Sequence, residues 1–211
     1  FASPVHDEKY SAAFVVKTCM DLQNKVKGYM FWCCSDVYEE QFMLGKPFHG
    51  GFGLVNNDGI PKPNFWAFKI LSQLYDRRLV TMDVENKEVE YAVFTDGENM
   101  QILVWSQSGD YFKHDTYDIE ITLNVLAQSV VAQFIDDVHC NPKAEWIKLG
   151  KPDLLTREQV AQIKEKTMLK TEAIPFDVTH SETLIKMTIT TNDVVLIHVE
   201  GQKGKSDEIE E

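Results

Sequence analysis

The spacing of apolar residues changes once along this 211-residue chain, near residues 76–78, and this change constrains the fold more than any other feature. Before it, apolar residues recur at intervals of three and four, which is typical of amphipathic helices. After it, apolar and polar residues alternate, which is typical of strands with one buried face. We therefore predict an α/β part over residues 1–76, followed by a mainly β part over residues 77–200.

The first part predicts the order helix, strand, helix. Residues 7–27 form one apolar helical face, with Asp7 as the expected N-cap and Gly28 as the end. Residues 29–34 are apolar on both faces, which favours a buried strand of a parallel sheet. After a glycine-rich stretch, residues 64–76 predict a second helix. Because a parallel strand needs parallel neighbours, this part is expected to be the last piece of a larger domain.

The second part predicts an antiparallel β-sandwich. Asp96-Gly97 is a hairpin turn signal, and Thr156-Arg157-Glu158-Gln159 is a capping box that predicts one inserted helix over residues 156–166. We expect the charged, acidic tail over residues 201–211 to be disordered. The expected strands are residues 88–95, 100–105, 117–125, 130–135, 183–190 and 194–199.

Charge and composition exclude several classes of partner. A formal net charge of −12 argues against binding to nucleic acid or to an anionic membrane surface. No apolar run approaches the roughly 18 residues of a membrane span, and Phe1 opens no signal peptide. The charge and the absence of a long apolar run therefore predict no nucleic-acid and no membrane partner. The cysteines form neither a disulfide framework nor a zinc motif, so we predict a cytoplasmic protein. They are Cys19, Cys33, Cys34 and Cys140.

Several separated motifs occur in one order along the chain. They are residues 31–40 (FWCCSDVYEE), 47–54 (PFHGGFGL), 59–63 (GIPKP), 141–146 (NPKAEW), 149–152 (LGKP) and 155–160 (LTREQV). Together they resemble glycoside hydrolase family 39, which contains the bacterial β-xylosidases and the α-L-iduronidases. The resemblance covers roughly residues 2–170, and motifs in a shared order are more specific than any one of them.

In that family a TIM (β/α)8 barrel carries an accessory β-sandwich. The resemblance implies that residues 1–76 are the last helix, strand and helix of such a barrel, and that the sandwich follows. The family's acid/base glutamate, in an Asn-Glu-Pro motif, and its nucleophile glutamate have no counterpart here. No catalytic residue is therefore assigned, and we expect this chain alone to be inactive. Because two carboxylates perform the family's chemistry, we expect no metal and no cofactor.

The resemblance indicates four substrate-binding residues: Trp32, Glu39, Glu40 and His49. The matching glutamate pair of the family hydrogen-bonds sugar hydroxyls. Adjacent residues point in different directions, so Glu39 and Glu40 are poorly placed to flank one bond as acid and nucleophile. Their alternative role is favourable charge in the first turn of a short helix. Trp32 either stacks on a sugar face or packs in the core, and His49 either contacts a ligand or caps a turn. A cis peptide between Trp32 and Cys33 is also implied.

We therefore predict the C-terminal portion of a retaining β-xylosidase that releases xylose from xylo-oligosaccharides. The alternative is a non-catalytic sandwich module for glycan binding or subunit assembly. The aromatic residues considered for glycan binding are Trp105, Tyr111, Phe112 and Tyr117, although aromatic residues at regular strand positions more often fill a core. Because the apolar faces of residues 1–76 would lack a barrel, we also expect a homo-oligomer.

Overall fold

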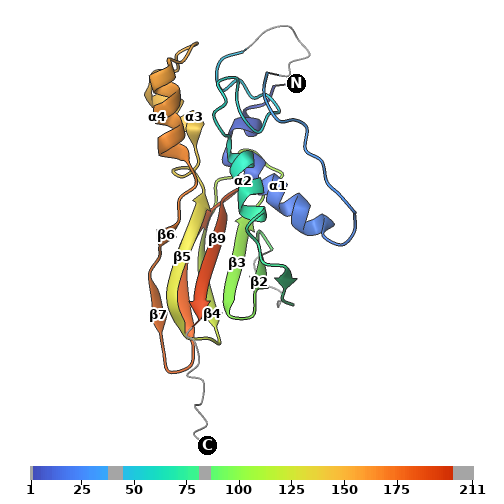
Figure 1. The fold of residues 1–211 in the computed structure, drawn as a ribbon, viewed down its shortest axis with the longest axis vertical. Coiled ribbons are helices and arrows are strands. Elements are labelled where there is room, and N and C mark those ends of the chain that lie inside the picture. Colours follow the sequence, from blue (N-terminus) through green and yellow to red (C-terminus); the bar gives the residue numbers. More distant parts are fainter. Residues whose placement is uncertain (1, 38–44, 81–86, 202–211) are drawn as a thin grey trace, which may run out of the picture.

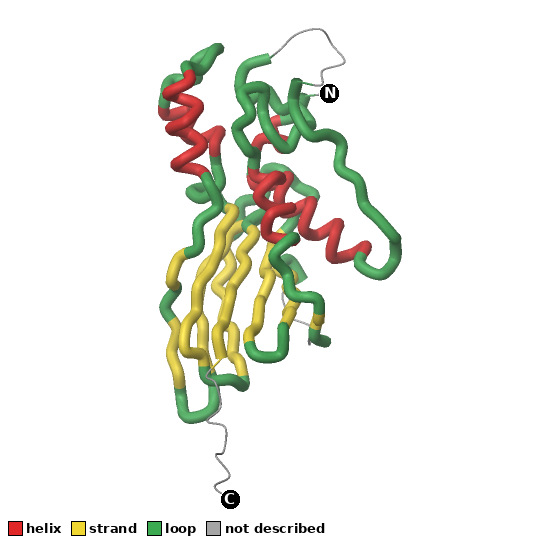
Figure 2. The backbone as a smooth tube through the Cα atoms, in the orientation of Figure 1, coloured by secondary structure: helices red, strands yellow, loops and turns green. Residues whose placement is uncertain are grey.

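The structure is a computed structural model, which describes residues 2–37, 45–80 and 87–201. The strands fill one half of the molecule in Figure 2, and the helices and long loops fill the other. All paired strands run antiparallel. The fold is therefore mainly β and antiparallel, as the alternating pattern beyond residue 78 predicts.

Two sheets form the sandwich (Figure 1). The larger has six strands in the order β1-β2-β3-β9-β5-β6, and the smaller has three in the order β4-β8-β7. Their apolar faces meet in one core cluster, in which Val93 and Ile102 of the large sheet join Ile185 of the small one. The strands are β1 Arg77–Arg78, β2 Val89–Thr95, β3 Asn99–Ser106, β4 Thr116–Leu123, β5 Ala127–Ile135, β6 Glu172–Ala173, β7 Phe176–Val178, β8 Thr183–Thr190 and β9 Val194–Gly201.

Strand β9 lies in the middle of the large sheet, between β3 and β5. Val195 and Ile197 belong to the core between the sheets, whereas Val194 and Leu196 belong to the core on the opposite face. Burial on both faces explains why this strand reads as a continuous apolar run rather than as an alternating one.

Helices cover that opposite face of the large sheet. Ala12 and Val16 of α1, together with Ile70 of α2, share a cluster with Leu103 and Leu196 of the sheet. Helices α3 and α4 belong to a separate small cluster beside the end of β5 (Figure 1). The helices are α1 Lys9–Leu22, α2 Pro63–Leu71, α3 Pro142–Lys148 and α4 Arg157–Thr167, and a short 3-10 helix, Pro4–Asp7, precedes α1. No helix in the described ranges is long and apolar enough to cross a membrane.

The first helix differs from its prediction at both ends. Its N-cap is Glu8 rather than Asp7, which is fully buried instead. It ends at Leu22 rather than near Gly28, because the chain leaves the helix in a turn where Asn24 has a φ of 65°. Asparagine tolerates this left-handed conformation better than most residues.

The buried strand predicted over residues 29–34 is wrong. The stretch belongs to no sheet, and Met30 and Trp32 are 95% and 64% exposed. Its end bonds to residues 52–55: Cys33 N donates to the Phe52 carbonyl at 3.3 Å, Leu54 N donates to the Cys33 and Cys34 carbonyls at 3.1 Å, and Val55 N donates to the Cys34 carbonyl at 3.2 Å. One isolated parallel bridge joins Ser35 to Val55. The described residues offer no parallel strand beside it, and a parallel strand without neighbours cannot form a ladder.

Two local predictions are confirmed. Gly97 has a φ of 109° in the turn between β2 and β3, and Thr156 and Gln159 form the reciprocal hydrogen bonds of a capping box at the start of α4. Helix α3 was not predicted, although Asn141 caps it and Pro142 occupies its first position. The expected second helix ends at Leu71, five residues early. Of the tail, residues 202–211 lie outside the described residues.

We expect hydrogen exchange to distinguish the segment at residues 29–34 from the centre of the sheet. The amides of Met30 and Phe31 should exchange at least about 100-fold faster than those of Leu196 and Ile197, because β9 is paired on both sides. NMR-detected exchange would measure this. Equal protection would show that the segment has sheet partners in solution.

Candidate functional site: an aromatic pocket around Trp32

A fully buried lysine joins three segments that are distant in the sequence. The Lys62 Nζ lies 2.7 Å from Asp7 Oδ1 and 3.1 Å from Asp36 Oδ2, and it donates to the Gly51 carbonyl at 2.8 Å. Asp7 ends the 3-10 helix, Asp36 follows the segment that carries Trp32, and Lys62 is the residue before α2. We call Asp7, Asp36 and Lys62 the buried triad.

Backbone amides complete the polar contacts of the buried triad. Gly50 N donates to Asp7 Oδ2 at 2.7 Å, and Gly53 N donates to Asp36 Oδ1 at 2.6 Å. Burial raises the pKa of Asp7 above its ordinary value, and the attraction of Lys62 acts against that rise. The buried triad therefore orders the glycine-rich loop as well as the three segments.

The glycines of this loop are required by close backbone approach. A Cβ on Gly50, whose φ is 87°, would lie 2.5 Å from the Ser3 carbonyl oxygen, and a Cβ on Gly53 would lie 2.3 Å from Asp36 N. Neither distance is possible for a real side chain. The glycine-rich motif therefore serves backbone geometry.

Beside the buried triad lies an aromatic pocket of about 290 Å³. Trp32 and Phe52, which is 40% exposed, line it together with Phe14 of α1. The His6 ring packs on Phe52 with 4.8 Å between ring centroids, and His6 Nδ1 lies 2.7 Å from the Gly50 carbonyl oxygen. The other residues that line the aromatic pocket are Val5, Tyr10, Ser11, Phe31 and Asn64. An exposed aromatic rim of this kind suits a ligand with an apolar face.

The structure describes two of the four predicted site residues, Trp32 and His49, and only Trp32 lines the pocket. Trp32 lines the pocket and does not fill the core. The ring of His49 lies 2.9 Å, at Nδ1, from the Lys46 carbonyl oxygen, so it caps its own turn and does not line this pocket. Glu39 and Glu40 lie outside the described residues, and their predicted role stays a prediction. The implied cis peptide between Trp32 and Cys33 is confirmed.

Sequence reasoning missed the other residues of the pocket. His6 and Phe14 precede the motif that contains Trp32 by many residues, and nothing local indicates that they approach it. Phe52 lies inside the glycine-rich motif, in which the resemblance indicates only His49 as a site residue. The sequence signal that could have indicated Phe52 is its position between Gly51 and Gly53.

The fold is shared with solved glycoside hydrolases. A monomeric β-xylosidase from Caulobacter crescentus CB15 has a TM-score of 0.73 and 26% identity, and the match covers 95% of this chain and 43% of that one. A bacterial orthologue of human α-L-iduronidase has a TM-score of 0.66 at 11% identity, which shows the fold alone.

The family is shown by sequence. The profile described as Glycosyl hydrolases family 39 matches residues 1–182, so the chain belongs to that family, as its motifs indicated. Among curated relatives, the β-xylosidase of Caldicellulosiruptor saccharolyticus is 30% identical over 201 residues, and that of Geobacillus stearothermophilus is 27% identical over 203. These matches cover 93% and 94% of this chain but only 41% and 38% of the relatives.

Replacing Lys62 by Met should destabilise the chain by about 3–5 kcal/mol, because it leaves two buried carboxylates without their cation. Urea unfolding followed by tryptophan fluorescence would measure the change. Lys69→Met, on the exposed side of α2, is the matched control and should change stability by less than about 0.5 kcal/mol.

A second variant identifies the cause of the loss. Adding Asp7→Asn and Asp36→Asn to Lys62→Met removes the uncompensated charges, so it should recover part of the stability. If Lys62→Met alone costs less than about 1 kcal/mol, the buried triad does not hold these segments together.

Proposed function

We propose that this chain is the C-terminal part of a retaining β-xylosidase that releases xylose from xylo-oligosaccharides. The observation that carries the proposal is the exposed Trp32, which lies at the rim of an aromatic pocket within the motif that resembles the family. The similarity to two curated β-xylosidases supports the choice of xylosides over other glycosides.

Trp32 and Phe52 supply binding rather than chemistry. The C–H face of a pyranose is apolar and packs on an aromatic ring, whereas its hydroxyls need polar partners. Glu39 and Glu40 are proposed to accept hydrogen bonds from these hydroxyls. The buried triad fixes the backbone on both sides of the pocket, through Asp36 and through Gly50 and Gly53. Trp32 is therefore presented to a substrate with little freedom to lose on binding.

The described part of the pocket contains no carboxylate of its own. Retaining hydrolysis needs two carboxyl groups about 5–5.5 Å apart, and none of the residues that line this pocket is Asp or Glu. We therefore propose that the acid/base and nucleophile glutamates belong to a part of the protein outside this sequence, and that this chain alone is inactive.

The purified 211-residue chain should show no turnover of 4-nitrophenyl β-xyloside above a buffer blank, because it lacks both catalytic glutamates. A chromogenic assay over several hours at neutral pH would measure this. Hydrolysis that follows the chain through purification would overturn the proposal that the catalytic residues lie elsewhere.

In the longer protein that this proposal implies, Trp32→Ala should lower kcat/KM for xylobiose at least tenfold, about 1.4 kcal/mol of transition-state binding. Steady-state kinetics would measure it. The matched control is Trp66→Ala on α2, a tryptophan that does not line this pocket. No loss from Trp32→Ala would show that Trp32 contacts no sugar, and an equal loss from Trp66→Ala, which packs against the core, would show that the effect is structural.

Two further expectations stay predictions. The apolar faces of α1 and α2, on which the expected homo-oligomer was based, are packed on the large sheet. Phe14, Trp32 and Phe52 are among the exposed apolar side chains that remain for a contact between copies. The Caulobacter crescentus relative is monomeric. The cytoplasmic location also stays a proposal, based on the cysteine pattern alone.

A further inference from the structure

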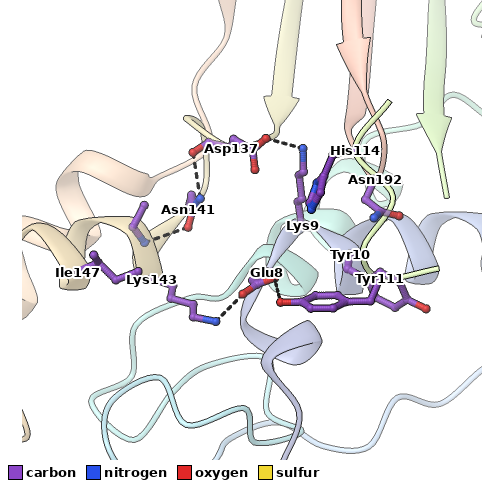
Figure 3. A pocket seen from close by; sticks show the side chains of 11 residues that line it. Glu8, Lys9, Tyr10, Tyr111, His114, Asp137, Asn141, Lys143, Ile147 and Asn192 are labelled. Carbon is purple, nitrogen blue, oxygen red and sulfur yellow. Dashed lines mark hydrogen bonds and ion pairs between the residues drawn. The ribbon is translucent and has the colours of Figure 1, made fainter. Parts of the chain in front are cut away.

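A second pocket, of about 210 Å³, lies where the start of α1 approaches the sandwich (Figure 3). Three elements build it: Glu8 and Lys9 at the start of α1, Tyr111 and His114 between β3 and β4, and Lys143 of α3. Tyr10 lines both this pocket and the aromatic pocket around Trp32. We call the second one the Tyr111 pocket.

The charged groups of the Tyr111 pocket are paired with one another. The Glu8 carboxylate accepts a hydrogen bond from Tyr111 Oη at 3.0 Å and one from Lys143 Nζ at 2.5 Å. Lys9 Nζ lies 2.7 Å from Asp137 and 2.8 Å from Asp193. Each cation faces a carboxylate and Lys9 faces two, so these two ammoniums and three carboxylates carry one excess negative charge. Such a lining offers fixed hydrogen-bonding groups and suits a neutral ligand rather than an anion.

Two groups of this lining, Lys9 and Tyr111, keep their protons at neutral pH. Burial opposes the charge of Lys9, but its hydrogen bonds to Asp137 and Asp193 raise the pKa of Lys9 above its ordinary value. Burial and the bond to Glu8 raise the pKa of Tyr111, so its hydroxyl stays a donor. Lys9 therefore stays a cation and Tyr111 stays a hydrogen-bond donor at neutral pH.

Aromatic rings form the apolar part of the pocket. Tyr111 meets Tyr10 edge to face, with 6.3 Å between centroids, and both residues line the pocket. Phe112, which does not line the pocket, packs against Tyr111 with 5.2 Å between centroids. Trp105 and Tyr117, the other two aromatic candidates of the sandwich, are buried in its cores. Tyr111 differs from them because it lies in a connection between strands, where its ring faces a pocket (Figure 3).

Two polar groups at the edge of the pocket remain available to a ligand. Asn192 Oδ1 accepts from Ser108 N at 3.1 Å, which orients the amide, and its NH₂ group has no hydrogen-bond partner in the described part of the chain. The same holds for the ring of His114, which is exposed. Both side chains line the pocket.

We propose that the Tyr111 pocket binds one neutral sugar unit of a glycan. Tyr111 packs on the apolar face of the sugar, and Glu8, Asn192 and His114 hydrogen-bond its hydroxyls. The ion pairs and caps around the pocket are already formed, so little side-chain freedom is lost on binding. This site goes beyond the proposed function, since none of its residues except Tyr10 lines the aromatic pocket around Trp32.

Xylotriose is the probe, added to the 211-residue chain up to about 20 mM while backbone amide shifts are followed by NMR. The expected result is a saturable shift of amides around residues 111, 143 and 192. Tyr111→Leu should weaken this binding at least tenfold, because it removes the ring and the hydroxyl. Phe112→Leu is the matched control, since its side chain is exposed and does not line the pocket, and it should change affinity less than threefold.

The site is independent of Trp32 in the same experiment. Trp32→Ala should leave the shifts at residues 111, 143 and 192 unchanged, so failure here and failure of the proposed function are distinguishable. If Tyr111→Leu lowers the thermal midpoint, His114→Ala is the second variant and should weaken binding at least threefold without unfolding. The proposal is overturned if no amide of the Tyr111 pocket shifts, if Phe112→Leu matches Tyr111→Leu, or if trigalacturonate binds more tightly than xylotriose.

Discussion

The ammonium of Lys62 is the interaction on which the rest of the candidate site depends. It lies between Asp7 and Asp36 with no exposure to solvent. It therefore holds together three segments, each separated from the next by more than twenty residues of sequence. The segment that carries Trp32 belongs to no sheet in the described chain, and its position is set instead by Asp36 and by a few backbone bonds to the glycine-rich loop. Without a cation between them, two buried carboxylates would repel each other and separate these segments.

The start of α1 carries this constraint to the sandwich. Three consecutive residues each face a different partner: Asp7 pairs with Lys62, Glu8 with Lys143 and Tyr111, and Lys9 with Asp137 and Asp193. The innermost pair is fully buried and the outer ones are partly exposed, so the first should dominate stability and the others should mainly fix geometry. Both pockets adjoin this turn, and Tyr10, which lines both, follows it directly.

Local patterns predicted most of the strands and the capped helix α4, because those signals lie within a few neighbouring residues. Strand β8 occupies residues 183–190 as predicted, and Thr156 and Gln159 form their capping box. The prediction over residues 29–34 failed because an apolar run indicates burial but not a pairing partner. Asp7 resembled an N-cap for the same reason: an acid before a helix is a local signal, whereas its true partner, Lys62, is far away in sequence. Both pockets collect residues from distant segments, which one sequence cannot bring together.

Burial and exposure divide the N-terminal part in a way that bears on function. The apolar faces of α1 and α2 pack on the large sheet, so the sandwich and the two helices share one core. Phe14, Trp32 and Phe52 remain partly outside it, around a pocket whose backbone the buried triad holds rigid. The exposed part of an aromatic side chain adds no burial to stability, and fixing the side chain in place costs conformational entropy. A segment that orders aromatic residues without burying them is organised for a contact that the described chain does not itself provide.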